Sequence, residues 1–269
     1  MIFYYSGTGN TKWAALELSR RLGGRLCFIP EALSVPGGSH ADMCDYYIDR
    51  EESVGFCFPV HGWQPPHIVR DFVARLRLFE SDGSPLSSRH YVYALVTCGD
   101  ETGLTMELFQ RCLEAVGLPL HGRFALVMPE TYVCLPFMHT DTKERERMKL
   151  SQAASDLEEI IHQISGRTPV SVAPHRGSMP WLLSHLFGAF FNRFMITDRP
   201  FRVDASRCTR CGLCARSCSV HNIRGGGGLL PEFLHTGRCT CCLSCYHHCP
   251  RHAINYGRIT ERRGQYYLS

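Results

Sequence analysis

Nine of the fifteen cysteines lie between Cys208 and Cys249, and their spacing constrains this chain more than any other feature. The series Cys208-x2-Cys211-x2-Cys214-x3-Cys218 is followed by Cys239-x2-Cys242-x2-Cys245-x3-Cys249, so one spacing pattern occurs twice as an internal repeat. The rest of residues 201–269 is rich in Arg and Gly. About seventy residues of this kind cannot bury enough apolar surface to be stable by packing alone. We therefore expect metal ligation to hold this region together.

The spacing favours two 4Fe-4S clusters with crossed ligands. Three thiolates two residues apart cover one side of a cubane, and the fourth cysteine of each repeat then completes the cluster of the other repeat. Zinc also binds four thiolates, but its sites usually consist of two Cys-x2-Cys pairs separated by a longer loop. Cys241 is out of register and is expected to be a bystander, with alternative ligation or redox sensing left open. The predicted ligand sets are Cys208, Cys211, Cys214 and Cys249, and Cys239, Cys242, Cys245 and Cys218.

The end of the second repeat carries a resemblance to a known family. The run Cys249-Pro250-Arg251-His252-Ala253-Ile254 is similar to the Cys-Pro-x-x-Ala-Ile ending of bacterial-type two-cluster ferredoxins. This resemblance implies a small α+β ferredoxin-like domain with two 4Fe-4S clusters. The chain departs from the family at Ser219, where proline normally follows the fourth cysteine, and at 224–231, where four consecutive glycines lengthen the loop between the repeats.

A turn rich in glycine and hydroxyl groups lies near the amino terminus. It follows the apolar run 2–5 and precedes a helical pattern that continues to about Leu22. Backbone N–H groups at a helix start can bind a phosphate together with hydroxyls. The turn lacks the Gly-Lys-Ser/Thr of a P-loop and the G-x-G-x-x-G of dinucleotide sites. It resembles the phosphate loop of flavodoxins, which implies bound FMN; an empty loop or another phosphate ligand is the alternative. Its residues are Ser6, Gly7, Thr8, Gly9, Asn10 and Thr11.

Strand-like runs alternate with helical patterns through the first 165 residues. The runs are 2–5, 25–29, 54–59, 91–97 and 123–128, and the later helical patterns are 67–79, 104–116 and 142–164. This alternation predicts an α/β fold with a five-stranded parallel sheet covered on both faces. The flavodoxin resemblance implies a doubly wound sheet of strand order 2-1-3-4-5. We expect three regions: 1–165 as a flavodoxin-like FMN-binding domain, 166–200 as a linker with an apolar helix, and 201–269 as the ferredoxin-like domain.

The loops that follow strands three, four and five are expected to surround the flavin ring. In this strand order, ligands bind at the carboxyl ends of the strands beside the point where the order reverses. Trp63 either stacks on the ring or packs on Pro65 and Pro66, and His61 either donates a proton to the flavin or is solvated. The predicted contacts are Pro59, Val60, His61, Gly62, Trp63, Thr97, Cys98, Gly99 and Asp100.

Charge is distributed unevenly between the two halves of the chain. Residues 1–165 carry 15 Lys and Arg against 21 Asp and Glu, whereas residues 166–269 carry 14 against 4. The arginines are interleaved with cysteines, so nucleic-acid binding is not expected. The amino terminus lacks a signal-peptide pattern and no apolar run is long enough for a transmembrane span, which together with the thiols predicts a reducing cytoplasmic location. The apolar segment 181–196 is expected to pack between domains or in a dimer contact rather than lie on a membrane.

The whole chain resembles the flavodoxin–ferredoxin fusion proteins called EFR-family ferredoxins. The resemblance includes Gly62-Trp63, the loop Met128-Pro129-Glu130-x-Tyr132 and the apolar connecting segment. It implies electron transfer between FMN, two 4Fe-4S clusters and redox protein partners, with the donor and the acceptor unidentified. Two alternatives are an FMN-dependent reductase of an organic substrate, with His61 or Tyr132 as an acid, and a redox or iron sensor.

Overall fold

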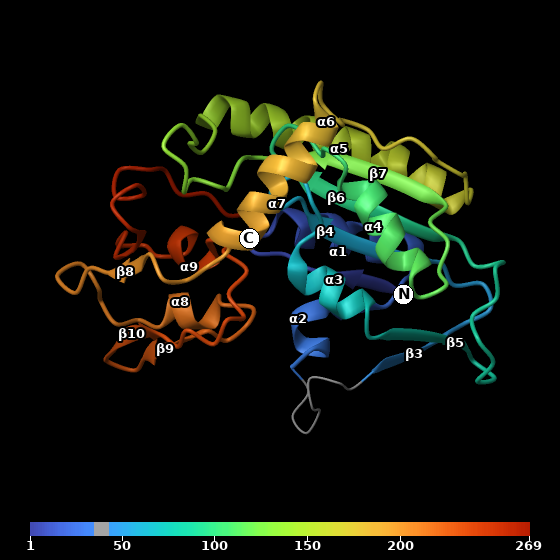
Figure 1. The fold of residues 1–269 in the computed structure, drawn as a ribbon, viewed down its shortest axis with the longest axis horizontal. Coiled ribbons are helices and arrows are strands. Elements are labelled where there is room, and N and C mark those ends of the chain that lie inside the picture. Colours follow the sequence, from blue (N-terminus) through green and yellow to red (C-terminus); the bar gives the residue numbers. More distant parts are fainter. Residues whose placement is uncertain (35–42) are drawn as a thin grey trace.

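The computed structural model describes residues 1–34 and 43–269. We call residues 1–165 the sheet-bearing part, 166–200 the connecting segment and 201–269 the carboxy-terminal part (Figure 1). The sheet-bearing part contains β1 (Ile2–Tyr4), α1 (Asn10–Leu22), β2 (Leu26–Phe28), α2 (Ile29–Ala32), β3 (Cys44–Ile48), β4 (Val54–Pro59), α3 (His67–Val73), β5 (Leu76–Glu80), β6 (Val92–Cys98), α4 (Thr105–Glu114), β7 (Gly122–Val127) and α5 (Lys143–Ser165).

The central sheet is parallel and has the order β2-β1-β4-β6-β7. This confirms the predicted α/β fold with a five-stranded parallel sheet. When the five strands of this sheet are numbered by their order along the chain, their order across the sheet is 2-1-3-4-5. The order reverses between β1 and β4, and the loops after these strands diverge there, which leaves room for a ligand at their carboxyl ends.

Alternate residues of each strand pack on opposite faces of the sheet. On one face, Phe3, Phe56 and Phe58 pack against α3 and α4 in one hydrophobic cluster. On the other face, Ile2 and Leu95 pack against the helices α1 and α5 in a second cluster. This alternation follows from the period-two side-chain geometry of a strand and explains why these strands read as continuous apolar runs.

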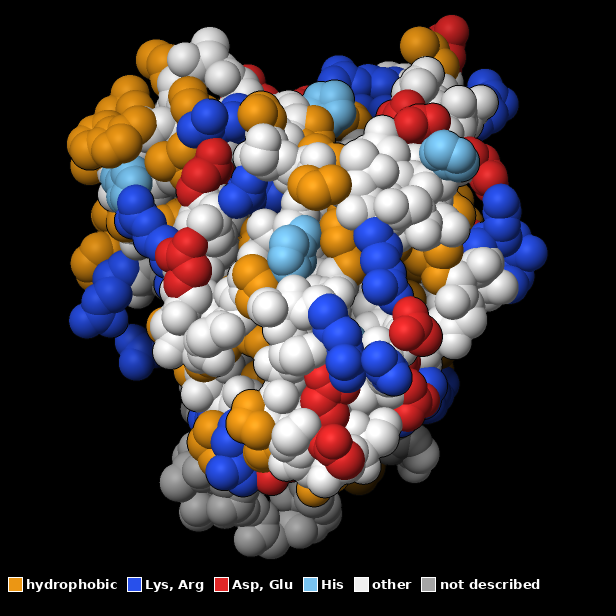
Figure 2. Space-filling view, turned by 90° about the vertical axis from the view of Figure 1, so that its right-hand side faces the viewer, with side chains coloured by type: hydrophobic (Ala, Val, Ile, Leu, Met, Phe, Trp, Pro, Cys, Tyr) orange, Lys and Arg blue, Asp and Glu red, His pale blue; other side chains and the backbone are white. Residues whose placement is uncertain are grey.

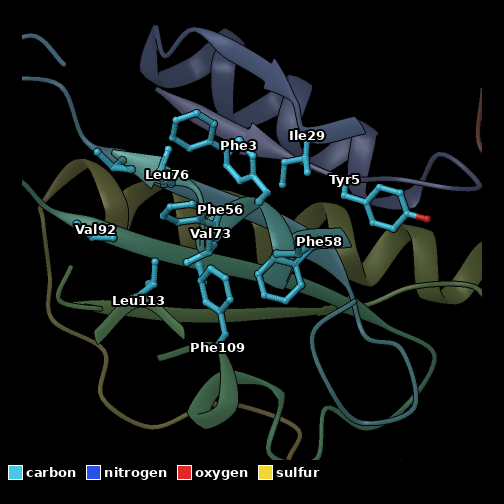
Figure 3. Close-up of a cluster of buried hydrophobic side chains, with 14 of the residues drawn as sticks. Phe3, Tyr5, Ile29, Phe56, Phe58, Val73, Leu76, Val92, Phe109 and Leu113 are labelled. Atoms are coloured by element: carbon cyan, nitrogen blue, oxygen red, sulfur yellow. The ribbon is translucent and has the colours of Figure 1, made fainter. Parts of the chain in front are cut away.

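Tyr5 lies at the edge of the first cluster. Its ring is fully buried, but its hydroxyl turns away from the other labelled side chains, beyond the end of β1 (Figure 3). The hydroxyl donates a hydrogen bond to Thr240 Oγ1 at 2.6 Å in the carboxy-terminal part. The core of the sheet-bearing part is therefore connected directly to the second cysteine repeat.

The predicted helix over 67–79 is wrong in its second half. Helix α3 ends at Val73, and residues 76–80 form β5, which pairs in parallel with β3 outside the central sheet. Leu76, Leu78 and Glu80 are buried while Arg77 between them is exposed, a period of two. The short apolar run was compatible with both structures, and pairing with β3, which was not predicted, decided between them.

The connecting segment is held against the sheet-bearing part. Val170 donates to the His121 carbonyl and accepts from the Arg123 amide, and Thr102 donates to the His175 carbonyl. A helix of alternating α and π character follows, with exposed Trp181, Phe190 and Phe194 on its outer side. Its four turns are α6 (Pro180–Leu182), η1 (Leu183–Phe187), α7 (Gly188–Phe190) and η2 (Phe191–Met195). In the part of the chain that the structure describes, this and every other helix is too short or too polar to cross a membrane.

The carboxy-terminal part has little regular structure. Strands β8 and β11 pair antiparallel, and the glycine-rich insertion between the repeats forms the hairpin β9-β10. Figure 1 shows this part beside one end of the central sheet, with the carboxy terminus returning to the junction. Its elements are β8 (Phe201–Val203), α8 (Leu213–Arg216), β9 (Ile223–Gly226), β10 (Leu229–Phe233), α9 (Ser244–His247) and β11 (Ile254–Tyr256).

The last residues of the chain pack on the glycine-rich turn before α1. The Leu268 amide donates to the Thr8 carbonyl at 2.8 Å, and the Tyr266 hydroxyl donates to Asn10 Oδ1 at 2.9 Å. Gly9 has a φ of +98°, and a Cβ added there would lie 1.8 Å from the Leu268 carbonyl oxygen. Glycine is therefore required both by the backbone conformation and by the terminal residues above it.

We expect Gly9→Ala to destabilise the protein more than Gly23→Ala. Gly23 also has a positive φ, +73°, but its added Cβ would have no neighbour within 4 Å. The control change should cost about 1 kcal/mol of backbone strain, and the clash at Gly9 adds about 1–3 kcal/mol. Chemical denaturation of protein purified without oxygen measures the difference. Equal unfolding midpoints for the two variants would contradict the contact with Leu268.

Candidate functional site

A cavity of about 430 Å³ lies at the carboxyl ends of β1, β4 and β6. Its size falls within the range of small-molecule sites. Every residue predicted to contact the flavin lines this cavity except Gly9, which lies against Leu268 instead. The predicted residues that line it are Ser6, Gly7, Thr8, Asn10, Thr11, Pro59, Val60, His61, Gly62, Trp63, Thr97, Cys98, Gly99 and Asp100.

The turn after β1 has the features of an anion site. Ser6 Oγ accepts a hydrogen bond from the Gly9 amide, and the Thr11 hydroxyl forms a hydrogen bond of 2.7 Å with the Thr97 hydroxyl on β6. Helix α1 begins at Asn10 with no acidic residue in its first turn, so no carboxylate competes there with a bound anion. The amino end of a helix favours negative charge because its first N–H groups have no partner within the helix. This end of the cavity suits a phosphate.

The connecting segment forms one wall of the cavity. Gly62 has a φ of +54°, and a Cβ added there would lie 2.5 Å from Phe191 Cδ1. The Asn192 side-chain amide donates to the His61 carbonyl at 3.1 Å, and the Gln64 amide donates to the Ser184 carbonyl at 2.7 Å. The apolar segment therefore packs on the loop after β4, between the sheet-bearing part and the carboxy-terminal part.

Two buried polar atoms of the cavity lining are without a hydrogen-bond partner among the described residues. They are His61 Nδ1 and the Tyr132 hydroxyl oxygen. Burial lowers the pKa of His61 to about 3, so its imidazole is neutral near pH 7. Buried polar groups without partners are costly, and those in a cavity gain partners when a ligand with complementary polar atoms binds.

An ionic network lies on the other side of the cavity and was not predicted. Glu130 Oε1 accepts hydrogen bonds from the Thr131 and Tyr132 amides, and burial raises the pKa of its carboxyl group. Lys149 donates to the Gly99 carbonyl and to Asp141, each at 2.8 Å. A Cβ added at Gly99 would lie 2.1 Å from Glu130 Oε2. The network fixes the loop after β6 against the loop after β7.

The ligand-type cysteines of the two repeats surround two hollows. They divide into the same two groups of four that the crossed pattern predicts. Among the residues that the structure describes, no three His, Cys, Asp or Glu side chains gather closely enough to hold a single metal ion. The first hollow is lined by Cys208, Cys211, Cys214 and Cys249. The second is lined by Cys218, Cys239, Cys242 and Cys245, and also by Cys241.

The two repeats have matching backbone conformations. Arg210 and Cys241, at equivalent positions, have φ values of +57° and +50°. Their amides donate to the sulfurs of Cys208 and Cys239, each at 3.4 Å. Later in the repeats, the sulfurs of Cys218 and Cys249 each accept an amide hydrogen bond at 3.2 Å, from Asn222 and Ala253. Amide donors to sulfur stabilise thiolates and influence cluster potentials.

The second hollow adjoins the cavity. Cys242 lines both, and a Cβ added at Gly7 would lie 2.6 Å from Cys242 Cβ. On helix α9, His247 Nε2 donates to the Thr131 carbonyl at 2.7 Å, while its Nδ1 accepts from the Tyr266 amide. The second repeat is therefore fixed to the cavity loops by direct contacts.

The other lining residues come from two sources. The loops after β6 and β7 were expected to surround the flavin ring, and they contribute Glu101, Met128, Pro129, Glu130, Thr131 and Tyr132. The rest were not predicted at this cavity, and only three-dimensional packing brings them there. They are Leu135 and Met138 further along the segment after β7, Phe191 and Ile196 of the connecting segment, and Cys241 and Cys242 of the second repeat.

Comparison with known proteins bears on the cysteine repeats. No match was found among the curated proteins. Residues 201–224, which include the whole first repeat, match the family model of the 4Fe-4S binding domain. The chain therefore carries a ferredoxin-type 4Fe-4S binding domain, a kind of domain that serves electron transfer.

Proposed function

We propose that the chain is an electron-transfer protein that binds FMN in the cavity and one 4Fe-4S cluster in each hollow. Its flavodoxin-like domain would comprise residues 1–165, the linker 166–200 and the ferredoxin-like domain 201–269. The observation that carries the proposal is the shared wall: the cavity is lined both by the phosphate-type turn and by Cys241 and Cys242 of the second repeat. A flavin there would lie next to a cluster without any rearrangement of the chain.

The residues of the cavity fit FMN from one end to the other. The turn 6–11 offers backbone N–H groups and hydroxyls to a phosphate without a cationic side chain. At the other end, Trp63 and Tyr132 offer aromatic surface, and His61 Nδ1 and the Tyr132 hydroxyl await polar partners. Bound FMN accepts or gives up one or two electrons and can also take up or release protons, whereas each 4Fe-4S cluster transfers one electron at a time.

The residues between the cavity and the second hollow hold the two sites close together. Tyr5 reaches from the sheet to Thr240, Gly7 contacts Cys242, and His247 joins helix α9 to the loop after β7. Tyr5 and His247 are almost completely buried, so this junction excludes water. Placing both carriers in one chain raises the effective concentration of each at the other.

A second candidate function is the reduction of an organic substrate bound beside the flavin. The observation that favours it is the pair of buried unpartnered atoms, His61 Nδ1 and the Tyr132 hydroxyl, in the cavity lining. A hydroxyl donor at this place would protonate a substrate that receives a hydride. Neutral His61 would orient the substrate rather than act as an acid, because burial holds its pKa at about 3.

The first test is composition. The protein would be purified without oxygen, and iron, acid-labile sulfide and released flavin would be measured per chain. We expect about eight iron, eight sulfide and one FMN. Iron and sulfide without flavin would reject the assignment of the cavity, and zinc without sulfide would reject the assignment of both hollows. Substrate reduction at a rate that depends on the Tyr132 hydroxyl, tested with Tyr132→Phe, would favour the second candidate.

A further inference from the structure

The second repeat uses one face to contact the sheet-bearing part. The Thr240 hydroxyl accepts a hydrogen bond from Tyr5, and His247 donates one to the Thr131 carbonyl in the loop after β7. Between them, Cys241 and Cys242 line the cavity. Thr240, Cys241 and His247 are each no more than 2% exposed. Through this face the second hollow lies against the cavity of the sheet-bearing part.

The first repeat has an equivalent face, and in the part of the chain that the structure describes this face is exposed to solvent. Counting from the first cysteine of each repeat, Thr209, Arg210, Cys211 and Arg216 correspond to Thr240, Cys241, Cys242 and His247. All four residues of the first repeat are exposed. Matching backbone conformations place the same positions at the same sides of the two hollows. The side of the second hollow that lies against the cavity therefore has an equivalent side on the first hollow, and that side is exposed to solvent.

This exposed face is basic. Arg216 Nη1 donates to the Cys211 carbonyl at 3.0 Å, which holds its guanidinium beside Cys211, and Arg210 Nη1 donates to the Gly228 carbonyl at 3.3 Å. Arg251 also lines the first hollow and is exposed. Residues 201–224 carry five Arg against one Asp and no Lys or Glu. In contrast, Figure 2 shows Lys, Arg, Asp and Glu side chains interspersed on the far end of the sheet-bearing part.

We propose that the first-repeat face, made of Thr209, Arg210, Cys211, Arg216 and Arg251, docks an acidic one-electron carrier protein. The inference rests on the proposed function, since it requires a cluster in the first hollow. In the reaction, the reduced partner loses one electron and the cluster in the first hollow gains it, without transfer of a proton or formation of a covalent bond. The cluster in the first hollow would then exchange electrons with the partner, and the cluster in the second hollow with the flavin in the cavity.

The exposure of Cys211 favours a protein carrier over a nucleic acid. Cys211 is the exposed member of the first ligand set, so a partner seated on this face comes within contact of a cluster ligand. Arg216 bonds the carbonyl of this ligand and Arg251 lines the same hollow, so positive charge lies beside a cluster ligand. Complementary charge around an electron-transfer contact raises the association rate and orients the partner.

The test reverses the two central charges with Arg210→Glu/Arg216→Glu. The probe is a small acidic two-cluster ferredoxin, oxidised for calorimetric binding and reduced for stopped-flow transfer. At low salt we expect binding and transfer to weaken at least about tenfold, with the difference shrinking as salt rises. The charge-matched control Arg50→Glu/Arg111→Glu, at exposed positions of the sheet-bearing part, should change neither more than about twofold. Arg210→Lys/Arg216→Lys, which keeps both charges, should retain most of the binding and transfer of the unmodified protein.

The outcomes separate this inference from the proposed function. Iron, sulfide and flavin contents are measured for the unmodified protein and for every variant, and an unmodified protein without clusters refutes the proposed function itself. If the clusters are present and the Glu variant binds and accepts electrons like the unmodified protein, the docking surface is refuted. The inference is also refuted if Arg210→Glu/Arg216→Glu and the control Arg50→Glu/Arg111→Glu lose the same amount of binding and transfer. It is refuted as well if the protein binds a random RNA oligonucleotide more tightly than the acidic carrier.

Discussion

A protein lacking Cys211 and Cys249 should keep about half of its iron, whereas a protein lacking Cys211 and Cys218 should be depleted at both sites. Cys211 and Cys249 line the same hollow although they belong to different repeats. Removing both leaves the four cysteines of the other proposed ligand set in place, so one cluster of about four iron remains. Cys211 and Cys218 belong to the same repeat but line different hollows, so their loss leaves three cysteines of each proposed ligand set.

The two double variants are controls for each other, since each loses two thiols. Iron and sulfide analysis and the electron paramagnetic resonance spectrum of the reduced protein measure the outcome. If each repeat bound its own cluster, the results would be reversed, and the variant lacking Cys211 and Cys218 would keep one intact cluster. Cys241→Ala should leave the iron content unchanged, because the other four cysteines of its hollow make up the proposed ligand set.

The second large effect is expected on flavin binding by Thr8→Val. Thr8 lines the cavity in the turn before α1 and is 7% exposed, so valine fills its space without the hydroxyl. A hydrogen bond to a charged group contributes about 1.5–3 kcal/mol, so affinity for FMN should fall about ten- to a hundredfold. Fluorescence titration of flavin-depleted protein measures the dissociation constant.

Riboflavin, which has no phosphate, is the matched ligand control. Its affinity should be nearly the same for Thr8→Val and for the unmodified protein, so the variant loses preference for FMN rather than flavin binding in general. Thr168→Val, at an exposed position away from the cavity, controls for the loss of a hydroxyl. An equal loss of FMN and riboflavin affinity would place the effect of Thr8 on the ring or on folding. A change at Gly9 would be less informative, because it displaces Leu268.

The features predicted correctly from the sequence are those set by local patterns. The alternation of strands with amphipathic helices gave the parallel sheet, since each strand covered on both faces must read as apolar throughout. The turn 6–11 was placed at the start of α1 because glycines and hydroxyls between a strand and a helix have few other uses. The assignment of the cysteines to two crossed ligand sets, based on the reach of a short loop around a cubane, stays a prediction, and each set lines one hollow.

The errors arose where a local pattern fits two structures. Residues 76–80 have apolar side chains that suit either the end of a helix or a strand, and the neighbouring β3 determined the outcome. The glycine-rich insertion was expected only to lengthen a loop, but it pairs as the hairpin β9-β10 and brings the Gly228 carbonyl to Arg210. Pairing energy between segments is absent from a single-segment pattern, so such choices require the folded chain.

The sequence by itself determined a parallel sheet, a turn rich in glycine and hydroxyl groups before its first helix, and two repeats of four cysteines with one spacing. Only the tertiary structure decided how they are arranged, with Gly7 on Cys242, Tyr5 on Thr240 and Leu268 on the turn before α1. It also decided that one repeat faces the cavity and the other faces solvent. The physical reason is that spacing and periodicity act over a few residues, whereas these contacts join residues more than 200 positions apart and depend on complementary packing of complete surfaces.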